Sequence, residues 1–173
     1  MTRLDRSTAI LVIVDVQERL MPVISNREQI EANIVRLIRG CQILGVPILV
    51  TEQYVKGLGH TVEAVRNALG DAYAPIEKTC FSGYRDLDQR QVIVAGVEAH
   101  VCVYQTVADL LANGYEVTIV ADAVSSRTIE NKEIALRRMM SDGARLSSTE
   151  MALFELTVAS ATDEFRAISK LVK

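Results

Sequence analysis

The alternation of short apolar runs with longer amphipathic segments is the feature that most constrains the fold of this chain. Continuous apolar runs of about 4 to 8 residues are typical of strands that are buried on both faces. Longer segments with apolar residues at helical spacing are typical of helices that cover a sheet. Because parallel neighbours in a sheet need crossover connections, this alternation predicts a parallel sheet with helices on both faces.

The predicted strands span residues 9–17, 46–53, 74–82, 90–97, 115–123 and 144–148. The predicted helices span residues 26–45, 61–70, 100–114, 127–143, 148–157 and 162–173. We therefore predict the α/β class, a three-layer α/β/α sandwich around a six-stranded, mainly parallel, Rossmann-like sheet. The sequence contains no internal repeat, low-complexity segment or linker, so residues 1–173 are predicted to form a single domain.

The overall composition argues against several functional classes. Hydrophobic residues make up 49% of the sequence and charged residues 24%, which is ordinary for a soluble globular protein. The net charge of -3 gives no reason to expect nucleic acid or a membrane surface as partner. The three cysteines lack CxxC spacing, which favours a cytoplasmic protein over a disulfide framework. Of these, Cys41 and Cys80 are interpreted as packing residues.

Three chemically active residues lie at the ends of predicted strands. Asp15 ends the run "ILVIVD", Lys78 ends the short third strand, and Cys102 follows the fourth. Cys102 falls in the first turn of a predicted helix, where unpaired amides and the helix dipole favour a thiolate. Because ligands of such sheets bind outside the carboxyl ends of the strands, we expect all three side chains at one crevice. A thiol, a carboxylate and an ammonium group are sufficient for acyl transfer.

Each of these residues also has a structural interpretation. A strand-end Asp is often a turn residue, a strand-end Lys is often a solvated charge, and a Cys at a helix start often packs in the core. Other sites are disfavoured by the sequence. The stretch "KGLGH" lacks the GxGxxG spacing of a dinucleotide loop. With only His60 and His100 available, a Ser-His-Asp arrangement is also disfavoured.

Around the strand-end residues the sequence resembles the isochorismatase-like cysteine hydrolase superfamily. The matching stretches are "VIVDVQERL", "EKTCFS", "VIVAGVEAHVCVYQTVADLLANGYEVTIVADAVSSR" and "SSTEMALFELT". The resemblance extends over essentially the whole chain and is strongest to the branch of isochorismatase domain-containing proteins. It implies the isochorismatase-like hydrolase fold for the single domain.

The resemblance implies a role for each strand-end residue. In the family's Asp–Lys–Cys triad, Cys102 is the nucleophile, Asp15 is the general base, and Lys78 tunes charge and orientation. The resemblance also implies a cis peptide bond at Val97–Glu98, and an oxyanion hole made by the backbone amides of Glu98 and Cys102. Because family members commonly form oligomers, it implies a homo-oligomer as well.

Further residues are candidates for the substrate pocket, namely Gln17, Gln53, Tyr54, Phe81 and His100. Gln17 is placed either to bind substrate or to cap the loop after the first strand. Tyr54 offers a flat face and a hydroxyl group, whereas Phe81 is either a pocket wall or a core residue. His100 lies in the nucleophile turn and is interpreted as a hydrogen-bonding residue, without a role in proton transfer.

Two departures from the family pattern affect the predicted site. Nicotinamidases of the superfamily carry an Asp/His metal site near the second strand, but here that region reads "TEQYVKGLGH", with His60 as its only histidine. We therefore predict no metal, no cofactor and no nicotinamidase activity. Many members also have a helix after "CFS". The connection 83–91 leaves little room for one, so the pocket wall on this side is expected to differ.

The favoured hypothesis is an amidohydrolase-like cysteine hydrolase that cleaves a small-molecule amide or ureido C–N bond through a Cys102 thioester. A second hypothesis is isochorismatase-type ether hydrolysis, which needs Asp15 but not Cys102. A third is a catalytically silent oligomeric scaffold or binding protein of the same fold. In that case the triad residues can be replaced without consequence for function.

Overall fold

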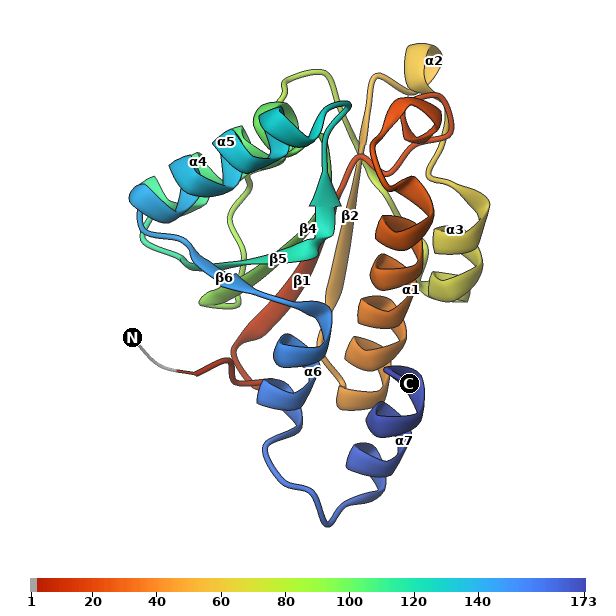
Figure 1. Cartoon of the computed structure of the whole chain (residues 1–173), viewed down its shortest axis with the longest axis vertical. Helices are drawn as coiled ribbons and strands as arrows, with labels where there is room; N and C mark the ends of the chain where they lie inside the picture. Colours follow the sequence, from red (N-terminus) through yellow and green to blue (C-terminus); the bar gives the residue numbers. More distant parts are fainter. Residues whose placement is uncertain (1–2) are drawn as a thin grey trace.

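A six-stranded sheet forms the middle layer of the structure, a computed structural model that describes residues 3–173 (Figure 1). Every pair of neighbouring strands is parallel, in the order β3-β2-β1-β4-β5-β6. The strands are Ala9–Val14 (β1), Ile48–Gln53 (β2), Ile76–Lys78 (β3), Gln91–Val97 (β4), Glu116–Ser125 (β5) and Arg145–Ser147 (β6). The predicted α/β/α class is confirmed, and the sheet is wholly rather than mainly parallel.

The α-helices are Arg27–Leu44 (α1), Val55–Leu58 (α2), Glu63–Leu69 (α3), Tyr104–Ala112 (α4), Ile129–Ser141 (α5), Thr149–Thr157 (α6) and Asp163–Leu171 (α7). Short 3-10 turns lie at Met21–Val23 and Gly70–Ala72, and a π-helical turn, Ala99–Val103, leads into α4. The helix α2 was not predicted, and the helix predicted over 100–114 begins as this π-helical turn. Within residues 3–173, the helices are too short or too polar to cross a membrane.

The central strand β1 divides the core between the two helical layers. Successive side chains of a strand point to opposite faces of the sheet. One face of β1 packs in a cluster with α1, α3, α6 and α7, and contributes Ala9, Leu11 and Ile13. The other face packs in a cluster with α4 and α5, and contributes Ile10, Val12 and Val14. Figure 1 shows these two groups of helices on opposite sides of the sheet. This double burial explains why the run is apolar at every position.

The order of the strands creates a crevice at the carboxyl edge of the sheet. The chain moves outward from β1 through β2 to β3, then returns to the other side of β1 at β4. Such a reversal separates the loops that leave the two central strands, and ligands of α/β proteins bind there. The described connection between β3 and β4, residues 79–90, contains no helix. This agrees with the little room expected from the sequence.

Gly96 marks a close approach between β4 and β1. Its φ is +124°, and an added Cβ would lie 2.1 Å from the carbonyl oxygen of Val14. We expect Gly96→Ala to lower the free energy of unfolding by more than about 3 kcal/mol, because backbone cannot yield to the methyl group. Urea denaturation measures this loss.

Gly143→Ala is the matched control for this substitution. Gly143 also has a positive φ, +111°, but an added Cβ there meets no atom within 4 Å. We expect a loss of about 1 kcal/mol from backbone strain alone. Equal losses in the two variants would contradict the role assigned to the close approach.

Candidate active site

Asp15 lies directly after β1, with its side chain fully buried at the carboxyl edge of the sheet. Its backbone is left-handed, with φ 51°, which is uncommon for a residue other than glycine. The Oδ1 atom accepts a hydrogen bond of 2.7 Å from the hydroxyl group of Thr51 on β2. The Oδ2 atom lies 2.6 Å from Nζ of Lys78. The buried carboxylate is therefore both paired and hydrogen-bonded, as its burial requires.

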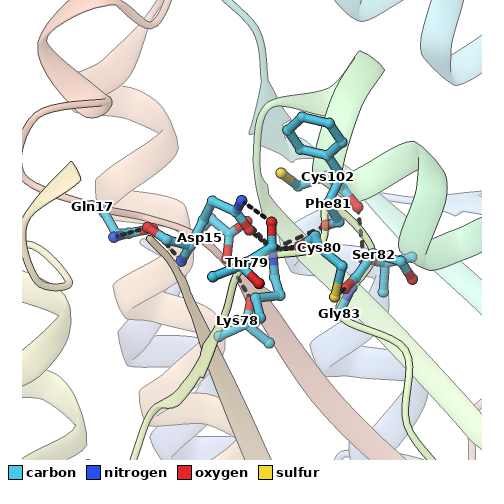
Figure 2. A network of polar contacts seen from close by, with 12 residues as sticks. Asp15, Gln17, Lys78, Thr79, Cys80, Phe81, Ser82, Gly83 and Cys102 are labelled. Atoms are coloured by element: carbon cyan, nitrogen blue, oxygen red, sulfur yellow. Dashed lines mark hydrogen bonds and ion pairs between the residues drawn. The ribbon is translucent and has the colours of Figure 1, made fainter. Parts of the chain in front are cut away.

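Lys78 ends the edge strand β3, and only 7% of its side chain is exposed. Besides its bond to Asp15, Nζ donates to Oε1 of Gln53 at 2.9 Å. It also donates to the backbone carbonyls of Phe81 at 3.0 Å and Cys80 at 3.4 Å. An ammonium group has three protons to donate. Because acceptors surround it on several sides, the charge is held in one place (Figure 2).

Cys102 lies in the π-helical turn after β4 and is 6% exposed. The charges of Asp15 and Lys78 both act on its thiol. The structure therefore brings the three strand-end residues together, and Figure 2 shows them beside the segment 79–83. The peptide bond Val97–Glu98 is cis, the geometry that the resemblance implies before the nucleophile.

The Cys102 thiol is protonated at neutral pH. Burial raises the pKa of this thiol to about 12; the Asp15 carboxylate adds to the increase, and the Lys78 ammonium group opposes it. The expectation that the helix start favours a thiolate is therefore wrong for the resting protein. Loss of hydration disfavours the charged form, and here it outweighs a helix dipole worth about 0.3–1 kcal/mol. A nucleophilic role for Cys102 consequently needs an adjacent base.

The two candidate glutamines have different positions. Gln17 is fully buried, and its Nε2 donates to the carbonyls of Gln53 at 2.9 Å and Gly59 at 2.6 Å. Its Oε1 accepts from the backbone N–H of Gln53 at 2.7 Å. Gln17 therefore does not reach a pocket, because its side chain bonds the end of β2 and the loop at Gly59. Gln53 holds Lys78 through Oε1 and the carbonyl of Thr79 through Nε2, at 2.9 Å in both cases.

A cavity of about 700 Å³ opens beside Lys78 and is lined by Tyr54, Val55, Lys56, Glu77, Lys78, Thr79 and Cys80. Tyr54 is 56% exposed and lies across Gly57, where an added Cβ would come within 2.4 Å of its ring. Phe81 is 53% exposed, so it does not belong to the core. Both aromatic side chains remain candidates for contact with substrate. Cys80 is exposed rather than packed, whereas Cys41 is buried as expected.

The side chains of Glu98 and His100 are held by the segment that follows β5. Oε2 of Glu98 accepts from Nε of Arg127 at 2.9 Å, and Nδ1 of His100 lies 3.0 Å from the Ser126 hydroxyl oxygen. His100 lines a separate cavity of about 160 Å³ with residues of α4 and α5. The structure therefore does not bring the His100 side chain to the cavity beside Lys78.

A metal centre near β2 is not assembled from the described residues. Within residues 3–173, no group of three or more His, Cys, Asp and Glu side chains could hold a metal ion. Nδ1 of His60 lies 3.2 Å from Glu52. The Glu52 carboxylate also accepts from the backbone N–H of Thr61 at 2.6 Å, and from the hydroxyl groups of Thr61 and Tyr73. These bonds fix the segment after β2.

Comparison with known proteins identifies the family. The model of the isochorismatase domain matches residues 9–151, which include Asp15, Lys78 and Cys102. The chain belongs to the isochorismatase family. The resemblance inferred from the motifs is thereby confirmed at the level of the family.

Known relatives cover nearly the whole of this isochorismatase-family chain. It is 36% identical over 176 residues to isochorismatase domain-containing protein 2 of Danio rerio, covering 98% of this chain and 89% of that protein. It is 37% identical to the solved MAR1 ribonuclease of Caenorhabditis elegans, covering 99% and 92% of the two chains with a TM-score of 0.94. Escherichia coli YcaC, described as an octameric hydrolase of unknown specificity, shares the fold at 21% identity, covering 99% and 89% with a TM-score of 0.86.

Two buried threonines of this isochorismatase-family site were not singled out from the sequence. Thr51 holds Asp15, and Thr106 donates to the carbonyl of Cys102 at 2.6 Å. Their spacing from residues already singled out could have indicated them. Thr51 lies two residues before Gln53 on one face of a strand, and Thr106 lies four residues after Cys102 on one face of a helix.

The raised pKa of Cys102 predicts how its alkylation depends on pH. We expect the rate constant with iodoacetamide to rise up to about pH 10 without a plateau, because the thiolate fraction grows until the pH passes the pKa. Mass spectrometry of each cysteine-containing peptide measures this rate.

Cys41 is the internal control for this profile. Burial also raises the pKa of Cys41 to about 12, but its side chain is fully buried, so we expect it to react more slowly at every pH. A plateau in the Cys102 rate near neutral pH would show a thiolate in the resting protein and contradict the prediction.

Proposed function

We propose that this isochorismatase-family protein hydrolyses a small-molecule amide or ureido C–N bond through a Cys102 thioester. The observation that carries this proposal is the buried Asp15–Lys78 ion pair, whose two charges both act on the nearby Cys102 thiol. A buried ion pair is often no more stabilising than apolar residues of similar volume. A catalytic role explains why such a pair is placed against a cysteine.

In the first half-reaction, the Cys102 sulfur attacks the substrate carbonyl carbon while its proton passes to the Asp15 carboxylate. The π electrons of the carbonyl move to its oxygen, and we assign stabilisation of this oxyanion to the backbone amides of Glu98 and Cys102. The tetrahedral intermediate then collapses, the C–N bond breaks, and the leaving nitrogen takes the proton from Asp15. An amine and a Cys102 thioester result.

In the second half-reaction, water attacks the thioester carbonyl and gives a proton to Asp15. The C–S bond breaks, the sulfur takes the proton back, and an acid is released. Lys78 keeps its charge throughout both steps. It balances the negative charge of Asp15 and fixes the direction of the carboxylate, so the same oxygen can accept and return the proton.

The low exposure of the site supports a small substrate. Cys102 is 6% exposed, and the Lys78 side chain is 7% exposed. A polymer chain would need a wider approach to the sulfur. RNA is the alternative substrate to consider, because the C. elegans relative is named a ribonuclease. The net charge of -3 offers no electrostatic attraction for a polyanion.

We also propose a homo-oligomer located in the cytoplasm. The octameric state described for YcaC of E. coli supports an assembly in the same fold. The three cysteines are free thiols, as expected in a reducing compartment.

p-Nitrophenyl acetate tests the thioester step with a small activated carbonyl. We expect release of p-nitrophenolate and one acetyl group on the peptide that contains Cys102. Asp15→Asn should slow the acetylation at neutral pH by about 100-fold, because the base is lost. Cys102→Ser should abolish the thioester. Absorbance and peptide mass spectrometry measure the two products.

Cys80→Ser is the matched control, because Cys80 is an exposed thiol that lines the neighbouring cavity and whose side chain takes no part in the mechanism. It should leave acetylation of Cys102 unchanged. Isochorismate hydrolysis that survives Cys102→Ser but not Asp15→Asn would favour the ether hydrolase instead. A parent protein in which Cys102 is never acetylated would favour the silent scaffold, and cleavage of RNA would redirect the substrate search.

A further inference from the structure

Thr106 joins the turn that carries Cys102 to the connection that follows β3. It lies near the start of α4, and its side chain is buried. Its hydroxyl donates to the carbonyl of Cys102 at 2.6 Å and accepts from the backbone N–H of Gly83 at 2.8 Å. A hydroxyl group has one proton to donate and lone pairs to accept with, so both bonds form at once.

The segment held at Gly83 is the same segment that surrounds the Lys78 ammonium group. The carbonyls of Cys80 and Phe81 accept from Nζ at 3.4 Å and 3.0 Å. Gly83 itself lies near the lysine stem. A Cβ added at Gly83 would lie 3.4 Å from the Thr106 hydroxyl oxygen and 3.6 Å from Cε of Lys78. A shift of Gly83 would therefore move the carbonyl groups of Cys80 and Phe81, which accept hydrogen bonds from Nζ of Lys78.

Side-chain bonds fix this connection, because it has no regular structure of its own. Residues 79–90 form neither helix nor strand in the described chain. Gln53 holds the carbonyl of Thr79 at its beginning, and Thr106 holds the backbone N–H of Gly83 four residues later. Further along, the backbone N–H of Leu87 donates to the Tyr115 hydroxyl at 2.9 Å. Gln53 and Thr106 thus hold the two ends of the segment 79–83, and Thr106 is the one that ties it to the turn of Cys102.

We propose that Thr106 is a positioning residue that fixes the segment 79–83, and through it the Lys78 ammonium group, relative to Cys102. The inference rests on the proposed function only for its catalytic consequence. The positioning itself can be measured without a substrate, so the failure of one and the failure of the other are distinguishable.

Thr106→Val keeps the shape of the side chain and removes both hydrogen bonds. We expect hydrogen exchange at the Gly83 amide to become about 10-fold faster, because its acceptor is lost. We also expect acetylation of Lys78 by an N-hydroxysuccinimide ester to increase several-fold relative to Lys56, because the acceptors of the ammonium group become mobile. Thr106→Ser retains the hydroxyl group and should restore both values.

Thr157→Val is the matched control. Thr157 is a buried threonine on α6 whose hydroxyl donates to the carbonyl of Leu153, four residues earlier, at 2.7 Å. Both valine variants lose a buried hydroxyl and should lower the melting temperature. Only Thr106→Val should change Gly83 exchange and Lys78 labelling. Should Thr106→Val fail to fold, Thr106→Ala removes the same hydroxyl without added bulk.

Unchanged Gly83 exchange and Lys78 labelling in folded Thr106→Val would overturn the inference. If both respond while Cys102 of the parent is never acetylated by p-nitrophenyl acetate, the proposed function fails and the positioning role stands. If the parent is acetylated, we expect Thr106→Val to lower the rate at saturating ester by about 10-fold, since a misplaced group loses its effect. An unchanged rate would overturn the catalytic consequence.

Discussion

The buried ion pair between Asp15 and Lys78 is the interaction on which the arrangement of the site depends. Its atoms lie 2.6 Å apart, with the carboxylate fully buried and the lysine side chain nearly so. Taking two charges out of water costs several kcal/mol for each ion. That cost is offset only if the remaining donors and acceptors find partners. Thr51, Gln53 and the carbonyls of residues 80 and 81 supply them. Much of the carboxyl edge is thus built around one pair of charges.

The order of the strands makes this pair possible. β2 lies between β1, which ends before Asp15, and β3, which ends with Lys78. Thr51 and Gln53 lie two residues apart on β2, on the same face of that strand. One therefore reaches the carboxylate and the other reaches the ammonium group. On the other side of β1, the turn that follows β4 carries Cys102. The thiol and the ion pair lie at the same edge, where the strand order reverses, which is the usual place for ligands in such sheets (Figure 2).

The same burial that excludes water from the pair keeps the Cys102 thiol protonated. The nucleophile of the proposed mechanism is therefore created only when substrate is bound and Asp15 accepts the proton. A thiol of this kind resists stray alkylation and oxidation, which act on the thiolate. It also makes catalysis sensitive to the position of the groups around it. Thr106 and Gly83 are important for this reason. Their hydrogen bond sets the position of the Lys78 ammonium group relative to the Cys102 sulfur.

The sequence by itself determined the strands, the helices other than α2 and the edge of the sheet at which the site lies. Apolar runs bounded by amphipathic segments are readable because double burial leaves few polar positions within a strand. The edge is readable because the carboxyl ends of parallel strands must share one edge. Only the tertiary structure decided that Gln17 bonds the end of β2 and the loop at Gly59, that His100 is bound to Ser126, and that Cys102 is protonated. These properties depend on burial and on contacts between residues far apart in the chain, which no local pattern encodes.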